Sequence, residues 1–243
     1  MIRKSLIGLI CILAAGVQLR ATQDFERSYD LIPGRHITID NKMGDIKVTG
    51  YDGEDIKVVA RKEGPDQDEI EIVDRNFGLR VLLFPKFDKF KSTETKVNFE
   101  VKVPNDKAPL FMELKSGSGK IDVRDFNGWL VADSSRGEAK FVNVKGSLYV
   151  RSISGSIDAE IDQSKERTQM RFDSMSGDIR ITAPPDLDAL IAMRSMSGDL
   201  ETNFPLEIHK RRYGERNANG KLGNGMEMIW ISSVSGSVSL MKK

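Results

Sequence analysis

The chain has 243 residues, of which 39% are hydrophobic and 30% are charged, so it is long enough to bury a core as one domain. Its 37 Lys and Arg residues balance 36 Asp and Glu residues, and the net charge of +1 excludes the basic excess of a nucleic-acid-binding protein. Cys11 is the only cysteine and lies in an apolar N-terminal run, so no disulfide, thiolate metal site or thiol nucleophile is expected beyond that run.

The N-terminus has the outline of a secretory signal peptide. Arg3 and Lys4 precede the apolar run 6–17, and small residues follow up to Ala21. The apolar run has 12 residues, fewer than the roughly 20 that a transmembrane helix needs. The sequence therefore predicts a signal peptide over residues 1–21. The mature protein is expected to be periplasmic, on the cell surface or secreted, with no integral membrane span; an uncleaved signal anchor is the alternative.

Residues 24–110 are predicted to form an N-terminal β portion. Short runs alternate apolar and polar residues, as in HITID, DIKVTG and VNFEVKV, and glycine, proline or charged residues separate them. The spacing of these runs is irregular. We expect this portion to pack on the end of a stack and to cover its open strand edges.

From residue 111 onward the glycines follow a stricter order. Six corners share the pattern Ser-x-x-Gly and lie 18, 18, 22, 21 and 38 residues apart. Their residues are Ser116 and Gly119, Ser134 and Gly137, Ser152 and Gly155, Ser174 and Gly177, Ser195 and Gly198, and Ser233 and Gly236. Repeats of about 20 residues indicate a stacked architecture. The long last interval contains an insertion, residues 203–228, before the final repeat.

Each corner separates two strands whose apolar residues share one parity. Positions two and four after the glycine, and five and seven before it, are apolar in every repeat except at Thr202. The corner serine has the same parity, so we expect it to point inward and to hydrogen-bond backbone groups of the turn. A serine at every corner indicates a structural ladder rather than a nucleophile. The glycine either has a positive φ or lets the neighbouring coil approach closely.

Two topologies fit this parity. The corners could turn the chain around a β-helix, in which like positions of successive coils pair in parallel, or they could be hairpin turns of an antiparallel β meander. Identical serines favour the β-helix, because like residues form ladders when repeats stack in register. The predicted fold is therefore all-β: a β-solenoid-like stack of about 20-residue coils with an N-terminal β cap. Residues 24–243 are expected to be one unit, with the stack at 111–243.

These repeats resemble the bacterial "putative adhesin" β-strand-repeat family, also called toastrack domains. The resemblance rests on the Ser-x-Ser-Gly-Asp-Ile units, on NKMGDIKVTGYDG at 41–53, on FEVKVPND at 99–106 and on GKLGNGMEMIWISSVSGSVSL at 220–240. It covers about residues 36–243. It implies a β-solenoid-like fold in exported or envelope proteins, a role in adhesion or in envelope-stress signalling, and no established catalytic residues.

The first candidate binding surface is the basic part of the insertion. Its cationic residues are Lys210, Arg211, Arg212, Arg216 and Lys221. Such a cluster could bind phosphate, an anionic polysaccharide or lipid headgroups. The alternative is a solvated hairpin tip, since the segment is rich in glycine and asparagine.

The second candidate is an apolar row beside the corners, which we call the corner row. The residue two before the corner glycine is apolar in four repeats, at Ile153, Met175, Met196 and Val234. Parity turns these side chains outward, so they would line one edge of the stack as a partner surface. The alternative is that the insertion or a neighbouring segment covers the row.

A column of alternating charge is expected four residues before the corner glycines. Its members are Lys115, Asp133, Arg151, Asp173 and Arg194, followed by Ser232. Neighbours of opposite sign would pair across the strands and fix the register, at modest strength.

A pair of carboxylates is the one candidate catalytic or metal site. Asp178 and Asp199 follow corner glycines in what we expect to be adjacent coils, and two close carboxylates could bind a cation or act as acid and base. Arg180 and Arg194 are near enough in sequence to neutralise them. The two histidines, His36 and His209, have no ligand-like companion.

The expected function is non-enzymatic binding, with no cofactor, no metal and no nucleic-acid partner. We expect an exported, adhesin-like protein that binds an envelope or surface protein or glycan through its broad flank, the corner row or the basic insertion. One alternative is an envelope-stress signalling or scaffold module that acts by protein–protein contact. The other is a polysaccharide-active β-helix enzyme that uses Asp178 and Asp199.

Overall fold

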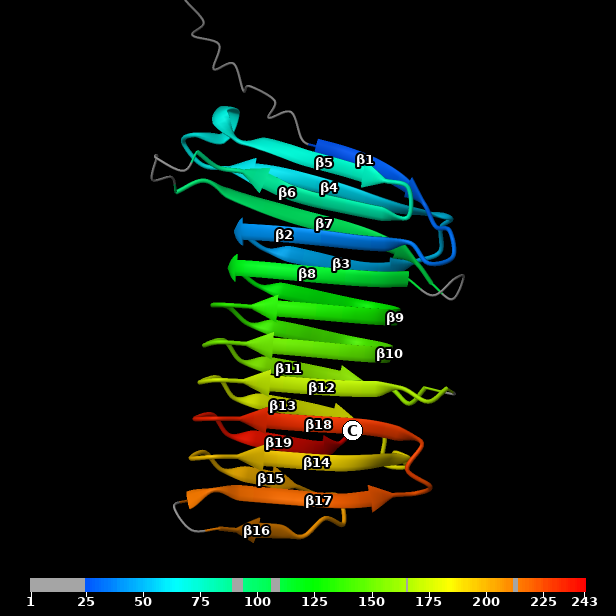
Figure 1. Cartoon of the computed structure of the whole chain (residues 1–243), viewed down its shortest axis with the longest axis vertical. Helices are drawn as coiled ribbons and strands as arrows, with labels where there is room; N and C mark the ends of the chain where they lie inside the picture. The colour runs from blue at the N-terminus through cyan, green and yellow to red at the C-terminus, as the bar shows by residue number, and fades with distance from the viewer. Residues whose placement is uncertain (1–24, 89–93, 106–109, 165, 212–213) are drawn as a thin grey trace, which may run out of the picture.

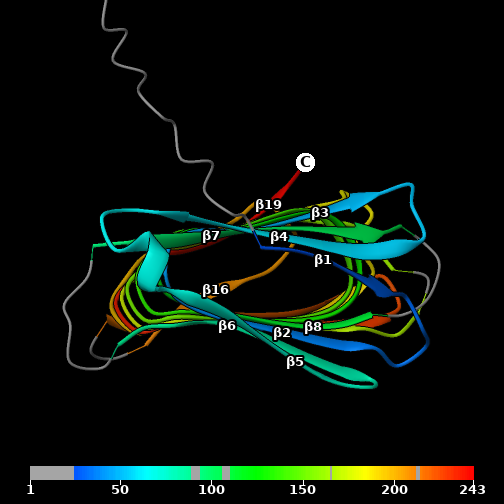
Figure 2. The ribbon, with the colours of Figure 1, turned by 90° about the horizontal axis from the view of Figure 1, so that it is seen from above.

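The computed structural model describes residues 25–88, 94–105, 110–164, 166–211 and 214–243. Within these ranges the chain forms nineteen strands and one short 3-10 helix, Gln67–Glu69. The strands build a tall stack (Figure 1) with two layers that face each other, as the view from above shows (Figure 2). The predicted signal peptide lies outside the described residues.

The two layers are the two flanks of the stack. Listed from one end to the other, the first flank contains β1 (Phe25–Asp30), β4 (Asp55–Glu63), β7 (Lys96–Pro104), β3 (Ile46–Tyr51), the first half of β9 (Ile121–Ser134), the first half of β10 (Ala139–Ser152), β11 (Ile157–Ile161), β13 (Ile179–Ala183), β19 (Val238–Lys242) and β15 (Leu200–Thr202).

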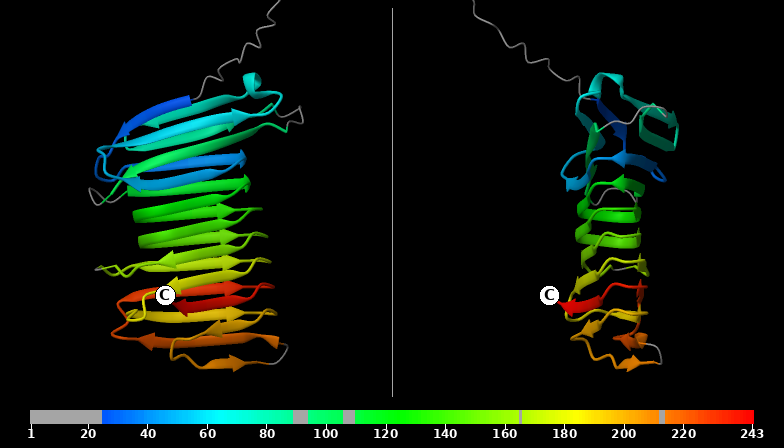
Figure 3. Two further views of the ribbon diagram at one scale, coloured as in Figure 1. Left: turned by 180° about the vertical axis from the view of Figure 1, so that it is seen from behind. Right: turned by 90° about the vertical axis from the view of Figure 1, so that its left-hand side faces the viewer.

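The second flank runs in the same direction. It contains β5 (Glu71–Phe77), β6 (Arg80–Lys86), β2 (His36–Met43), β8 (Leu110–Ser118), the second halves of β9 and β10, β12 (Gln169–Ser174), β18 (Glu227–Ser233), β14 (Ala189–Ser195), β17 (Arg216–Leu222) and β16 (Ile208–Lys210). The edge-on view in Figure 3 shows how thin the resulting body is.

Successive coils pair in parallel through the middle of the stack. Ser116 lies beside Ser134, Ser134 beside Ser152, and Ser152 beside Ser174. Among the described strands, antiparallel pairs occur only towards the two ends, in β1–β4–β7, β5–β6 and β14–β17–β16. The predicted β-solenoid-like stack is confirmed, and the repeats do not form an antiparallel meander.

The order of the coils in space differs from their order in the chain near the C-terminus. The last coil, β18 and β19, pairs with β12 and β13 on one side and with β14 and β15 on the other. Figure 1 shows it as the red level between two yellow ones. The expectation that Asp178 and Asp199 lie in adjacent coils is therefore wrong. The long insertion carries the chain beyond β14, and the last coil returns between the two earlier coils.

The N-terminal end also has a coil that lies out of chain order between two others. We call each such coil an exchanged coil. β2 and β3 form a complete coil that pairs with β8 and β9 on one side and with β6 and β7 on the other. The regular stack thus begins at His36 rather than at residue 111. The corner of this first coil has Asn41 in register with Ser116, followed by Gly44 three residues later. A pattern that requires serine misses this corner.

The core is a layer of apolar side chains between the flanks. Alternate residues of each coil point inward, and Phe99, Phe126, Phe141 and Phe172 are the largest of the fully buried side chains. Burial of apolar surface, at about 25 cal/mol per Å², is the main stabilising contribution in such a body. The outward residues of the two flanks and the corners remain as candidates for binding.

Candidate binding surfaces

The corner serines lie inside the stack, between 0% and 5% exposed. In Ser116, Ser134 and Ser152 the hydroxyl donates to the carbonyl oxygen of its own corner glycine, at 2.7–3.2 Å. Ser174, Ser195 and Ser233 instead accept the amide N–H of their own glycine, at 2.8–2.9 Å. Because the turn uses these hydroxyls, the serine column is part of the fold and not a reactive site.

The corner glycines stack directly on one another's backbone. A Cβ atom on Gly177 would overlap the carbonyl oxygen of Gly155, and the same holds for each neighbouring pair of corner glycines down the column. Gly137 also has a φ of +130°. Close approach between coils is the requirement that all these positions share, so the column leaves no room for a ligand.

The corner row is exposed along one edge. Ile153, Met175, Val234 and Met196 are 44–56% exposed and follow one another in this order along the stack. Neighbouring strands are about 4.8 Å apart, so the row is about 14 Å long. Its members stay open to solvent, so the insertion does not bury them. The exchanged last coil places Val234 between the two methionines and makes the row continuous.

The basic insertion places its described cations at two ends of a hairpin: Lys210 and Arg216 are register partners, and Lys221 lies towards the other end of the same strand as Arg216. It folds into the hairpin β16–β17 at the end of the stack, with Lys210, Arg211 and Lys221 exposed. The Arg216 guanidinium lies 2.9 Å from Asp199 and donates to the carbonyl oxygen of Gly198 at 2.7 Å. Arg216 therefore holds the hairpin against the Gly198 corner. Arg212 lies outside the described residues.

Asp178 and Asp199 do not form a two-carboxylate site. Ser237 of the exchanged coil lies between them: its amide donates to Asp178 at 2.9 Å, and its hydroxyl accepts the Asp199 amide at 3.2 Å. Arg180 lies 3.0 Å from Asp178, whereas Asp199 pairs with Arg216. Within the described ranges, no three His, Cys, Asp or Glu side chains come together in a way that could hold a metal ion.

The charge column forms only part of the expected ladder. Arg151 and Asp133 make a two-pronged pair at 2.7 and 3.0 Å. Asp173 pairs with Arg171 of its own strand at 2.6 Å, and Arg194 pairs with Glu215 of the hairpin at 3.1 Å. The exchanged coil explains the break between Asp173 and Arg194, because it inserts Ser232 between them.

The outward residues of the first flank are mostly charged. One register column reads Lys47, Asp122, Lys140, Asp158 and Arg180 from coil to coil. Arg180 and Asp158 are 3.3 Å apart, which is the pairing that alternating signs allow. We call this side the charged flank. Such a surface is well solvated and gives exposed pairs of small energy.

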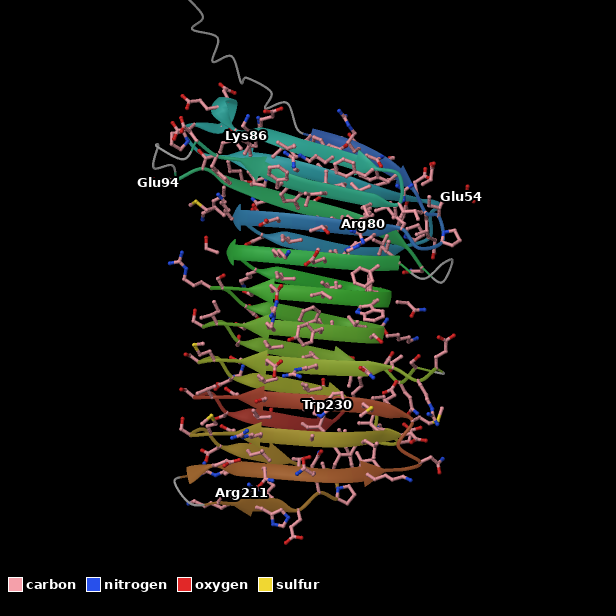
Figure 4. The ribbon with its side chains drawn as sticks, in the orientation of Figure 1. Glu54, Arg80, Lys86, Glu94, Arg211 and Trp230 are labelled. Carbon is pink, nitrogen blue, oxygen red and sulfur yellow. The ribbon has the colours of Figure 1, made fainter. Side chains whose placement is uncertain are left out.

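The outward residues of the second flank include a group of aromatic side chains. We call this side the aromatic flank and define it by His36, Phe111, Trp129, Tyr149 and Trp230. His36, Phe111 and Trp129 follow one another in one register column. Tyr149 and Trp230 lie in the next column, on either side of Arg171. Figure 4 looks onto this flank and labels Trp230 near its middle.

The rings of the aromatic flank are close enough to interact. The His36 and Phe111 ring centroids are 4.3 Å apart, edge to face, and those of Phe111 and Trp129 are 5.3 Å apart. Arg151 and Arg171 lie 5.4 and 5.8 Å from the Tyr149 centroid. Burial lowers the pKa of His36, against the opposing effect of Glu113. Trp129 is 54% exposed, so this platform is open to a partner.

Sequence reasoning named the broad flank but not these residues. The signal was present in the repeat alignment. Eight residues before the corner glycine stand Phe111 and Trp129, and six before it stand Tyr149 and Trp230, whereas His36 precedes Gly44, whose corner lies outside the six aligned repeats. Counting outward offsets in the same way as inward ones would have found both columns except for His36.

Comparison with known families identifies the family of this chain. The model of the family described as Toastrack DUF4097 matches residues 36–241, which is most of the chain. This chain belongs to the toastrack family. The toastrack segment begins at the first residue of β2 and ends within β19, so it includes both exchanged coils.

Three solved structures are similar to this toastrack chain. A "putative cell adhesion protein" from Clostridium sporogenes is 13% identical, with a TM-score of 0.48 and coverage of 91% of this chain and 100% of that one. A "putative adhesin" from Bacteroides fragilis is 14% identical, with a TM-score of 0.42 and coverage of 90% and 98%. A "putative lipid binding protein" from Parabacteroides distasonis is 14% identical, with a TM-score of 0.32 and coverage of 90% and 96%.

A comparison with curated proteins finds no match to this toastrack chain. Among the described residues of the toastrack structure, no helix has the length and apolar character that crossing a membrane requires.

Proposed function

We propose that this toastrack protein is an exported, non-enzymatic binding protein that holds a partner of the cell surface or envelope on its aromatic flank. The localisation follows from the predicted signal peptide at residues 1–21. The observation that carries the proposal is the difference between the flanks: both have charge pairs, but only the second flank also carries the outward aromatic side chains of Trp129, Tyr149 and Trp230 among the described strands.

The chemistry of the aromatic flank suits binding. Tryptophan, tyrosine and arginine are the residue types that dominate binding energy at protein interfaces, and large exposed apolar patches on a soluble protein mark interaction sites. The parallel ladders beneath these side chains hold them at fixed spacing, which reduces the entropy lost on binding. The proposal includes no catalysis, and the ion-paired states of Asp178 and Asp199 support this part of it.

The test is capture of the partner from a cell-envelope fraction by the immobilised mature protein. A variant with Trp129→Ser, Tyr149→Ser and Trp230→Ser should lose the captured material. The matched control removes three outward residues of the charged flank, with Asp122→Ser, Lys140→Ser and Arg180→Ser, and should capture as well as the wild type. Equal capture by the aromatic-flank variant, with the fold intact by circular dichroism, would contradict the proposal.

A second candidate function is an envelope-stress or scaffold module that acts through the corner row. It is favoured by the continuous exposure of Ile153, Met175, Val234 and Met196 on one edge. Methionine side chains are adaptable and are common on surfaces that bind proteins. In the same capture experiment, a Met175→Ser and Met196→Ser variant separates the two functions, because only the second depends on the corner row.

A further inference from the structure

Two residues at the edge between the flanks leave the strand ladder. Asp125 and Asn143 have φ values of +52° and +54°, and their neighbours pair as if these two residues were absent. Asp and Asn are among the few residue types that accept this left-handed conformation without large strain. The Asn143 side-chain amide donates to an Asp125 carboxylate oxygen at 2.6 Å. The bulges thus turn a row of polar side chains out of the stack.

These side chains line a shallow depression that is open to solvent. It has a volume of about 150 Å³ and is lined by Asn105, Asp125, Phe126, Asn127, Asn143 and Lys145. That volume is below the range of about 300–1,000 Å³ typical of small-ligand sites, so the depression could hold only one part of a larger ligand. The lining differs from most such sites, because it is polar. Amide side chains both donate and accept hydrogen bonds, as do hydroxyl groups of a ligand.

The depression continues directly into the aromatic flank. Asn127 and Trp129 are alternate outward residues of β9, and both are exposed. The register places Lys145 beside Asn127 and Ser147 beside Trp129. Phe111 lies beside Trp129 in the next coil, with ring centroids 5.3 Å apart. A ligand seated on Trp129 therefore has an aromatic ring below one part and amide and ammonium groups beside another.

We propose that this edge is a subsite for one sugar residue of a neutral glycan. The apolar C–H face of a pyranose ring would lie on Trp129, and its hydroxyl groups would bond to Asn127, Asn143 and Lys145. This inference rests on the proposed function and specifies its ligand as a saccharide.

The charges and shape of the subsite select this ligand class. Asp125 and Lys145 have opposite charges, so the lining offers no net attraction to an anion or a metal cation. A protein partner would need an apolar patch to fill the depression, whereas the lining has one aromatic side chain, Phe126, which is buried. A ring with one apolar face and a rim of hydroxyl groups matches both parts of the site.

The two tryptophans of the chain, Trp129 and Trp230, make a direct test possible. In a Trp230→Phe background, emission reports on Trp129 alone. The probes are soluble hexasaccharides of N-acetylglucosamine, glucose and mannose, oligosaccharides released from the host's own surface, and a galacturonate hexamer as the anionic comparison. A neutral oligosaccharide should change Trp129 emission in a saturable way and bind more tightly than the anionic hexamer.

Variants of the depression test the polar contacts. Lys145→Met and Asn127→Ala should each weaken binding about three- to tenfold, the effect of losing one hydrogen bond. Lys140→Met is the matched control on the same strand, because Lys140 is exposed on the charged flank, and it should leave affinity unchanged.

The outcomes separate this inference from the proposed function. If no neutral oligosaccharide affects Trp129, or if Lys145→Met and Asn127→Ala bind as the wild type does, the saccharide subsite is wrong. Envelope capture that still depends on Trp129, Tyr149 and Trp230 would then leave the proposed function standing. Capture that is independent of the aromatic flank would overturn both.

Discussion

At the scale of single residues, each corner is held by two small residues with different tasks. The serine hydroxyl satisfies backbone groups that no strand ladder reaches, and the glycine lets the next coil lie against it. Ser195 shows both directions of bonding: it accepts the Gly198 amide at 2.9 Å and donates to the Gly236 carbonyl oxygen of the neighbouring coil at 2.9 Å. One hydroxyl thus joins two coils.

Replacing Ser195 by alanine should destabilise the stack by about 1–3 kcal/mol, because a buried amide and a buried carbonyl would lose their partner. Thermal or urea unfolding measures the change. The control is Ser239→Ala on β19, a half-buried serine that points outward on the charged flank. Equal stability of the Ser195 variant and the wild type would mean that water replaces the hydroxyl at this corner.

The residue scale also shows what the sequence could predict. Parity and offset counting were enough to place the inward serines and the outward corner row, because strand side chains alternate strictly. Asn41 was missed because it replaces serine at an otherwise equivalent corner. Asp125 and Asn143 were missed because a bulge breaks the alternation on which the counting depends.

At the scale of elements, the start of β18 depends on a buried carboxylate. Glu227 is fully buried, beside Ala189 of β14. One of its oxygens accepts the Ser164 amide at 2.8 Å and the Thr168 hydroxyl at 3.1 Å, while the other, Oε2, has no hydrogen-bond partner within the described part of the chain. Burial raises the pKa of Glu227, and the charge of Asp188 acts in the same direction. The exchanged coil thus begins at a buried carboxyl group whose surroundings disfavour its ionised form.

The raised pKa of Glu227 sets the sign of a pH effect. Between the ordinary value of 4.5 and the raised value, the folded state binds more protons than the unfolded state, so the contribution of this group to stability falls as pH rises. Glu227→Gln is neutral at every pH and keeps an acceptor for Ser164 and Thr168. It should melt at a higher temperature than the wild type at neutral pH, and the difference should shrink as the solution is acidified.

Thermal scans from neutral pH down to pH 4.5 measure this difference. Glu201→Gln, on the exposed face of β15, controls for the loss of one negative charge. A wild type that is more stable than Glu227→Gln at neutral pH would show that the carboxylate is satisfied when ionised.

At the scale of the whole molecule, each end of the stack has one coil that lies out of chain order between two others. β2 and β3 lie inside β6 and β7, and β18 and β19 lie inside β14 and β15. Views from front and back show the same order (Figure 1, Figure 3). The repeat period predicted the stack, but not this order, because coils with the same corner and the same inward apolar residues are interchangeable neighbours. The only indication in the sequence is the length of the insertion, which is long enough for the chain to return between two earlier coils.

Native-state amide hydrogen exchange should report the out-of-order position of the last coil. In a solenoid stacked in chain order, the last coil is an end coil, and end coils open most easily. Here β18 is paired on both sides, by β12 and β14, so its amides at Ile229 and Ile231 should exchange as slowly as those of β12. Strand β16, which pairs with β17 alone among the described strands, should exchange fastest at this end. Faster exchange in β18 than in β14 would contradict the exchanged order and restore the chain order of the repeats.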